Sequence, residues 1–113
     1  MNRQENSVVI KRLKSKILIE RLFSQGEAYH TKYLMLRVLK NDQPIVYAGV
    51  SVPKRNLKRA VDRNKVKRQL RQVLKSEEKN LNIGGAYMLI YKGNELPLTK
   101  DLLKQCKNLF EKI

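Results

Sequence analysis

The sequence predicts an α+β fold in which one sheet packs against helices, within a single domain spanning residues 1–113. A chain of 113 residues has room for one modest core and no room for two. Apolar residues make up 42% of the chain, which is enough for a packed globule. Segments with helical spacing alternate with short apolar runs in the order helix, strand, strand, helix, strand, helix. This order is typical of a sheet-and-helix sandwich.

The first half of the chain predicts one helix and two strands. Residues 1–10 carry no clear pattern, and we expect a flexible or extended arm there. Apolar residues recur at helical spacing over 13–23, and Gly26 is a plausible stop for that helix. Two apolar runs follow at 33–40 and 45–52, with a short loop of turn-forming residues between them. This arrangement predicts an antiparallel hairpin.

The second half predicts two helices around one strand. A long helix is expected from Asn56, which could cap it, to about Lys79, because no proline or glycine interrupts that stretch. Its core-facing stripe consists of Val66, Leu70, Val73 and Leu74. Residues 86–91 have little polarity on either face, which favours an interior strand. Pro97 and Thr99 then introduce a last helix. The apolar face expected for that helix is formed by Leu102, Leu103, Cys106, Leu109, Phe110 and Ile113.

The charge balance indicates a polyanionic partner. There are 25 Lys and Arg against 10 Asp and Glu, a formal net charge of +15. Such a field repels itself in the compact state, so a nucleic acid or an anionic membrane is expected to bind it. No apolar run approaches the roughly 20 residues that span a bilayer, and the start of the chain has no signal-peptide stretch. We therefore expect a cytoplasmic protein with no membrane partner.

The positive charge is concentrated in residues 54–75, where Asp62 is the single acid. Ten basic side chains lie there: Lys54, Arg55, Lys58, Arg59, Arg63, Lys65, Lys67, Arg68, Arg71 and Lys75. A cationic arc of about 100° on the helix, at 3.6 residues per turn and away from the apolar stripe, consists of Asn64, Lys67, Arg68, Arg71 and Lys75. A solvated face normally mixes signs, whereas here neighbours one turn apart repel. A row of phosphates would relieve that repulsion.

The segment 58–72, KRAVDRNKVKRQLRQ, is similar to the signature of the protein component of bacterial ribonuclease P. That signature has Ala-Val, then Arg-Asn-Arg, then Lys-Arg, then a further Arg one turn on. The matching residues are Arg63, Asn64 and Lys65 for the triplet, Lys67 and Arg68 for the pair, and Arg71 for the last Arg. The run AGVSVPKR at 48–55 resembles the family's Gly-x-Ser-Val strand that leads into paired basic residues.

Two positions depart from the family pattern. Lys65 replaces the third residue of the triplet, which keeps the charge but loses the bidentate fork of arginine. Phe23 and Gly26 match the end of the family's first helix, whereas Ile19 stands where the family often has a second aromatic residue. Because Ile19 cannot stack on a base, the contribution of the first helix to single-strand binding is expected to be weaker.

The resemblance implies a mixed four-stranded sheet with helices and a left-handed βαβ crossover, against the usual right-handed rule. It implies that the basic helix docks on the catalytic RNA subunit and that the RNA, with its bound Mg²⁺, hydrolyses one phosphodiester of precursor tRNA. A cleft beside the first helix would take the 5′ leader. The implied RNA-binding residues are Lys54, Arg55, Lys58, Arg59, Arg63, Asn64, Lys65, Lys67, Arg68, Arg71 and Lys75. The implied leader-cleft residues are Ile19, Phe23 and Arg37.

The residues themselves predict no catalytic or metal-binding side chain in the protein. Metal-assisted hydrolysis needs clustered carboxylates or histidines, and here the acids are scattered and His30 is alone. Cys106 falls within an apolar stripe and is expected in the core. Two alternatives stay open at this point. A basic ribosomal or other structural RNA-binding protein would share the charge but not the ordered motif, and a free-standing nuclease would need the missing cluster.

Overall fold

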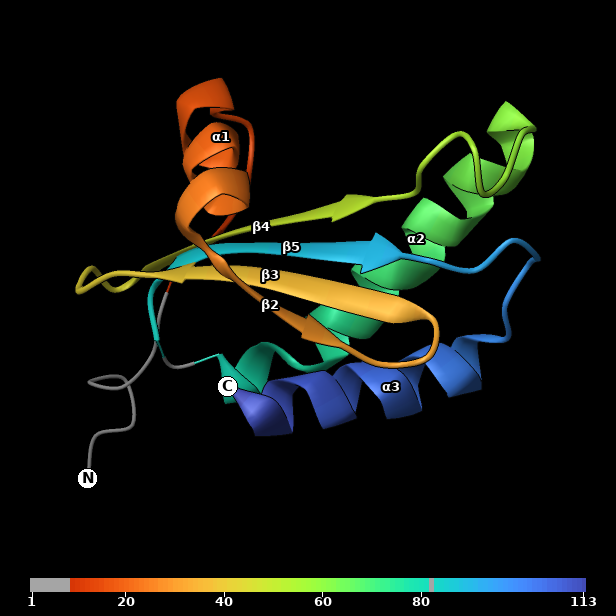
Figure 1. Cartoon of the computed structure of the whole chain (residues 1–113). Helices are drawn as coiled ribbons and strands as arrows, with labels where there is room; N and C mark the ends of the chain where they lie inside the picture. The colour runs from red at the N-terminus through yellow and green to blue at the C-terminus, as the bar shows by residue number, and fades with distance from the viewer. Residues whose placement is uncertain (1–8, 82) are drawn as a thin grey trace.

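Five strands and three α-helices make up the part of the chain described by the computed structural model, residues 9–81 and 83–113. In chain order the elements are β1 (Val9–Arg12), α1 (Lys16–Gln25), β2 (Glu27–His30), β3 (Leu34–Lys40), β4 (Ile45–Ser51), α2 (Ala60–Ser76), the short 3₁₀ helix η2 (Glu78–Asn80), β5 (Gly85–Tyr91) and α3 (Thr99–Lys112). The strands form one mixed sheet in the order β1-β4-β5-β3-β2. Helix α1 covers one face, and α2 and α3 pack against the other (Figure 1). The predicted α+β sandwich is confirmed, with five strands rather than four.

Strand β5 occupies the centre of the sheet, and all seven of its residues are buried. Tyr87, Leu89 and Tyr91 join the larger core beneath α2 and α3, while Met88 and Ile90 face α1 in a smaller apolar cluster. A strand that is apolar on both faces is stable only where both faces are covered. The prediction of an interior strand over residues 86–91 is confirmed.

The predicted hairpin between β3 and β4 is wrong. β5 lies between these strands, pairing antiparallel with β3 and parallel with β4. The two runs were expected to pair because they are adjacent in sequence, but the polar loop between them passes the end of β5. β5 takes the position between them because both of its faces are apolar. At the edge of the sheet it would expose more apolar surface than β3 or β4 would.

The connection from β4 to β5 is a left-handed crossover. The two strands are parallel neighbours, with Val46 opposite Gly85 and Ser51 opposite Ile90, and α2 lies between them in the chain. In Figure 1 the chain runs along β4 at the back, passes beneath the sheet in α2 and returns in β5 on the viewer's side of β4. This hand is opposite to that of most parallel connections and agrees with the expectation from the family resemblance.

Strand β1 includes the last two residues of the expected N-terminal arm. Residues 1–8 lie outside the described residues, but Val9 and Ile10 begin β1, which pairs parallel with β4. The first helix begins at Lys16 rather than at residue 13. Leu13 instead extends the β1 pairing through its N–H, 2.9 Å from the Ala48 carbonyl oxygen. The side chain of Ser15 then caps α1 by accepting a hydrogen bond from the Leu18 N–H at 3.2 Å.

Helix α2 begins at Ala60, four residues after the predicted cap. Asn56 does not cap it; its side-chain amide donates to the Tyr91 carbonyl oxygen at 3.4 Å. Arg59 holds the cap position without a side-chain hydrogen bond. The helix ends at Ser76, short of Lys79. The predicted core-facing stripe is confirmed, because its four residues are the buried residues of α2.

Helix α3 packs on the larger core through Leu102, Cys106 and Leu109, as expected. Leu103 is an exception, because 37% of its surface is exposed. The helix is tied to α2 by Gln69, whose side-chain nitrogen donates to the Pro97 carbonyl at 3.1 Å and to Thr99 Oγ1 at 3.0 Å. Thus the long basic helix is anchored on one side by its apolar stripe and on another by a polar link.

Gly26, the predicted stop of the first helix, directly follows α1, and a side chain there would collide with backbone atoms. A Cβ would overlap the Leu22 carbonyl oxygen and lie 2.9 Å from that of Val38. The backbone of Gly26 is extended, at φ −75°, so crowding rather than a left-handed turn demands glycine. Gly26→Ala is expected to lower the free energy of unfolding by about 1–3 kcal/mol, because inserted atoms force the backbone apart. Urea denaturation measures this.

Gly49 in β4 provides the matched control. A Cβ there would meet Leu13 Cβ at 3.4 Å and Met88 Sδ at 3.5 Å, which are ordinary contacts. Gly49→Ala is therefore expected to change stability by no more than about 0.5 kcal/mol. Equal losses for the two variants would contradict the crowding at Gly26.

Candidate nucleic-acid interface

The cationic arc of α2 is presented to solvent. Within the helix Ala60–Ser76, Asn64, Arg68, Arg71 and Lys75 are exposed and Lys67 is half-buried. The buried stripe on the adjoining side holds the helix on the core, so the arc cannot rotate inward. Side chains one turn apart lie about 5–6 Å from each other, a spacing at which a row of cations can contact successive phosphates. Lys65 is also exposed, but helical geometry places it outside this arc.

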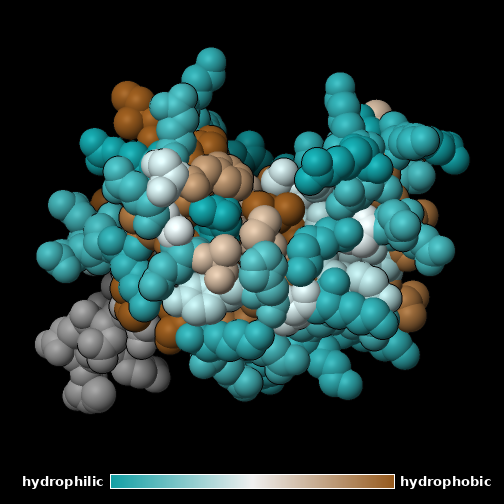
Figure 2. Space-filling view, in the orientation of Figure 1, coloured by the Kyte–Doolittle hydropathy of each residue, from teal (hydrophilic) through white to brown (hydrophobic). Residues whose placement is uncertain are grey.

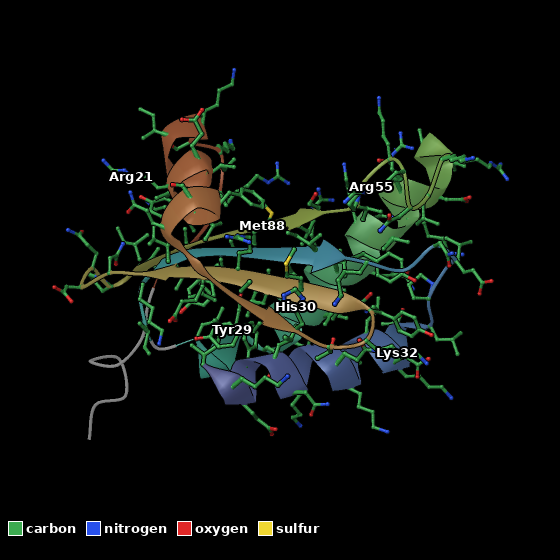
Figure 3. All side chains as sticks on the ribbon, viewed as in Figure 1. Arg21, Tyr29, His30, Lys32, Arg55 and Met88 are labelled. Carbon is green, nitrogen blue, oxygen red and sulfur yellow. The ribbon has the colours of Figure 1, made fainter. Side chains whose placement is uncertain are left out.

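A second group of cations lies before α2. Lys54, Arg55, Lys58 and Arg59 are exposed on the segment between β4 and the helix. Figure 3 places Arg55 above the sheet, on the same side as α1 and Met88. The predicted RNA-binding residues are therefore divided between the helix and this segment, which approaches the α1 face of the sheet.

Arg63 holds that segment in place. Its Nη1 donates to the carbonyl oxygens of Leu57 at 2.9 Å and Lys58 at 2.8 Å. These bonds stabilise the irregular chain ahead of a helix whose cap residue makes no side-chain hydrogen bond. Nη1 is thereby occupied, while Nη2 and Nε keep donors for another acceptor.

The α1 face of the molecule is hollowed between α1 and the segment that precedes α2 (Figure 2). Phe23 lies at the end of α1, and 45% of its surface is exposed. The guanidinium carbon of Arg37, in β3, lies 5.1 Å from the centre of its ring. Arg37 also donates through Nη2 to the Phe23 carbonyl oxygen at 2.8 Å and through Nε to that of Leu22 at 3.4 Å. A cation fixed over an exposed ring forms a preorganised platform for a flat, anionic ligand.

Ile19 lies one turn before Phe23 and has a different environment. It is half-buried and packs against the cluster that contains Leu13, Leu22 and Met88. The structure therefore brings Phe23 and Arg37 into contact and places Ile19 in the first turn of α1.

Two cations that the sequence analysis did not select lie on β1. Lys11 and Arg12 line a pocket of about 530 Å³ together with Arg71 and Lys75 of the cationic arc. The available signal was the pair Lys11-Arg12 directly after the apolar residues Val9 and Ile10, which is a short strand followed by charge. Residue spacing could not show that β1 would lie beside the end of α2.

Two of the remaining aromatic residues are structural. Tyr87 and Tyr91 are buried in the larger core, and burial raises the pKa of both phenols. Each hydroxyl donates to a nearby carbonyl oxygen, Tyr87 to Ile83 at 2.7 Å and Tyr91 to Glu95 at 2.6 Å. These two rings are therefore not available for stacking on bases.

Cys106 is buried in α3, whereas His30 is exposed at the end of β2. Burial raises the pKa of the Cys106 thiol to about 12, so it is protonated and enclosed at neutral pH. The Nδ1 of His30 lies 3.3 Å from the Lys92 ammonium. Over residues 9–81 and 83–113, no three His, Cys, Asp or Glu side chains gather as metal ligands.

A model of the Ribonuclease P family matches residues 9–113 of this chain. The chain belongs to the ribonuclease P protein family. It is 37% identical over 90 residues to the ribonuclease P protein component of Natranaerobius thermophilus, covering 78% of this chain and 77% of that protein. It is 27% identical over 104 residues to the component of Clostridioides difficile, covering 90% of each.

Solved structures of ribonuclease P proteins share the fold. The protein from Thermotoga maritima superimposes with a TM-score of 0.79 at 20% identity, covering 91% of this chain and 97% of that one. The protein from Staphylococcus aureus gives a TM-score of 0.75 at 20% identity, covering 89% and 93%.

Family membership defines the protein's role. The chain is the protein subunit of ribonuclease P, an endoribonuclease of tRNA processing, and its partner is the RNA subunit. The alternative interpretation, a basic ribosomal or other structural RNA-binding protein, is not favoured. Among the described residues, no helix is both long and apolar enough to cross a membrane.

Proposed function

We propose that this ribonuclease P protein uses two surfaces, one for the RNA subunit and one for the 5′ leader of precursor tRNA. The cationic arc of α2 binds phosphates of the catalytic RNA. The hollow beside α1 holds the single-stranded leader, so that its removal yields the mature 5′ end of the tRNA. The observation that supports the leader assignment is the exposed Phe23 ring with Arg37 fixed over it. We further propose that residues 1–113 act as one domain, in the cytoplasm.

The surface for the RNA subunit is assigned to exposed or half-buried side chains of α2 and of the segment before it, all of them cationic except Asn64. The proposed contacts are Lys54, Arg55, Lys58, Arg59, Arg63, Asn64, Lys65, Lys67, Arg68, Arg71 and Lys75. These side chains bind the RNA mainly through positive charge. Contacts to phosphates position a protein on the RNA without reading its sequence. Arg63 contributes through the donors that its clamp on Leu57 and Lys58 leaves free.

The surface for the leader is assigned to Phe23, Arg37 and Ile19. A base can stack on the exposed ring, and the guanidinium is close enough to the ring to pair with the adjoining phosphate. Arg37 acts twice, since its bonds to the two carbonyl oxygens also fix the end of α1. Ile19 offers only an apolar contact beside them.

The chemistry is hydrolysis of one phosphodiester, which we assign to the RNA subunit and to Mg²⁺ bound mainly by that RNA. The described side chains do not fit a protein-held Mg²⁺, because no three potential ligands gather. The protein contributes charge neutralisation and positioning, which lower the cost of bringing two polyanions together.

Phe23→Ala tests the leader assignment. Removing the ring is expected to weaken binding of precursor tRNA to the reconstituted holoenzyme by about 1–3 kcal/mol, the usual contribution of one stacked base. Mature tRNA, which has no leader, should bind as before. Affinities of the holoenzyme for the two tRNAs, with and without the ring, give the comparison.

Ile17→Ala is the matched control, because Ile17 lies on the same helix, is 66% exposed and points away from Phe23. It should leave both tRNAs unaffected. Affinity for the RNA subunit should also be unchanged in both variants. An equal loss for precursor and mature tRNA with Phe23→Ala, or a collapse of its melting temperature, would show that the ring is structural.

A further inference from the structure

The pocket at the β1 edge of the sheet has the size of a small-molecule site. It lies between the first turn of α1, the strands β1 and β4 and the end of α2. Its volume is about 530 Å³. Ligand sites in proteins usually enclose roughly 300–1,000 Å³. One of its lining residues, Met88, is seen beside α1 in Figure 3.

The lining combines an apolar wall with a cationic rim. The apolar wall includes Ile10, Leu13, Ile19, Val50, Leu74 and Met88. The rim carries Lys11, Arg12, Arg71 and Lys75, opposed by a single carboxylate, that of Glu78. A ligand that fits both parts has a flat apolar body and a negative charge. A nucleotide meets this description, because apolar side chains and guanidinium planes sandwich bases while the cations take the phosphate.

The pocket also contains a free stretch of strand edge. The pairing of β1 with β4 ends at Arg12 opposite Ala48, with one further bond from the Leu13 N–H to the Ala48 carbonyl at 2.9 Å. Val50, two residues on, directs its N–H and C=O to the same edge, where the described residues supply no further strand. An adjacent donor and acceptor on the backbone can pair with the polar edge of a base.

We propose that this pocket takes one unpaired nucleotide of the RNA subunit, its base against the apolar wall and its phosphate on the cationic rim. The inference rests on the role of the chain as an RNA-binding subunit and deepens it. The pocket shares Ile19 with the surface proposed for the leader, but its phosphate-binding rim shares two cations, Arg71 and Lys75, with the cationic arc, so the source is the RNA subunit. A strand lying on the arc therefore passes the mouth of the pocket. The captured base would set the register of that strand, which phosphate contacts alone do not specify.

Base protection on the RNA subunit tests the proposal. The full-length protein is bound to the RNA, and the RNA is treated with reagents that modify the Watson–Crick edges of unpaired bases. We expect one nucleotide to be protected by the wild-type protein. Ala48→Leu adds apolar atoms at the pocket lining without changing the charge. It should abolish that protection and weaken binding of the RNA subunit by about 5- to 150-fold, as for the loss of one stacked base.

If Ala48→Leu lowers the melting temperature, a second variant that changes only the charge of the rim still tests the proposal. Lys11→Gln with Arg12→Gln removes two exposed rim cations outside α2. The control, Lys104→Gln with Lys107→Gln, removes two exposed cations from α3. The first pair should lose the protected base, and the second should keep it.

Two results would overturn the proposal. One is a protection pattern that stays the same in both pocket variants, which would leave the subunit role intact because RNA binding itself persists. The other is a defect seen only with tRNA that carries a leader, which would give the pocket to the leader. Failure of the wild-type protein to bind the RNA subunit would instead remove the role on which the inference rests.

Discussion

Replacing Leu70 with alanine is expected to lower the free energy of unfolding by about 2–5 kcal/mol, the range for removing a buried leucine side chain and leaving a cavity. Leu70 is fully buried in the larger core, in the middle of the stripe that holds α2 on the sheet. Domains of this size are stable by only about 5–15 kcal/mol, so the loss is a large share of the total. Chemical denaturation monitored by circular dichroism measures it.

Leu96→Ala is the control for the same change of side chain at an exposed site. Leu96 precedes α3 and is 46% exposed, so its truncation should change stability by no more than about 0.5 kcal/mol. If Leu70→Ala unfolded no more easily than Leu96→Ala, the helical register of α2 would be wrong. The set of side chains assigned to the cationic arc would then also be wrong.

Replacing Arg68 and Arg71 together with alanine is expected to weaken binding to the RNA subunit by about 10²- to 10⁴-fold at low salt, as for the removal of two charge-assisted hydrogen bonds. Both residues are exposed on the cationic arc and away from the stripe, so the fold should persist. The dependence of log affinity on log salt should flatten by roughly 0.7–0.9 for each phosphate that the protein no longer neutralises. Titrations at several salt concentrations measure both effects.

Lys104→Ala with Lys107→Ala removes the same charge from the exposed side of α3. It should reduce affinity only slightly and keep the salt slope, because α3 is not part of the proposed surface. An unchanged slope for the Arg68 and Arg71 variant would refute the phosphate contacts. A slope that flattened equally in both variants would mean that net charge, rather than the arc, drives binding.

The elements that the sequence predicted well are those whose residues repeat a local pattern. The stripe from Val66 to Leu74 has helical spacing, and the structure buries it. Residues 86–91 are apolar on both faces, and they form the buried centre of the sheet. Local periodicity records which side of an element is covered, so it predicts burial even where partners are unknown.

Element boundaries were less predictable because backbone groups from distant parts of the chain decided them. Asn56 has the right chemistry for a helix cap, but its amide is bound to the carbonyl of Tyr91, a residue 35 positions away. Leu13 has helical spacing with the residues that follow, yet its N–H extends the pairing with β4. In both places a distant backbone group outweighed the local preference.

The sequence by itself determined the cationic arc, the interior strand and the family, because each depends on residue types at local spacings. Only the tertiary structure decided that β5 separates β3 from β4, that Arg37 lies over the Phe23 ring, and that Lys11 and Arg12 share a pocket with Arg71 and Lys75. These arrangements join residues far apart in the chain. They follow from the spatial order of the strands in the sheet, which depends on how much apolar surface each strand can bury. No local sequence pattern encodes that order.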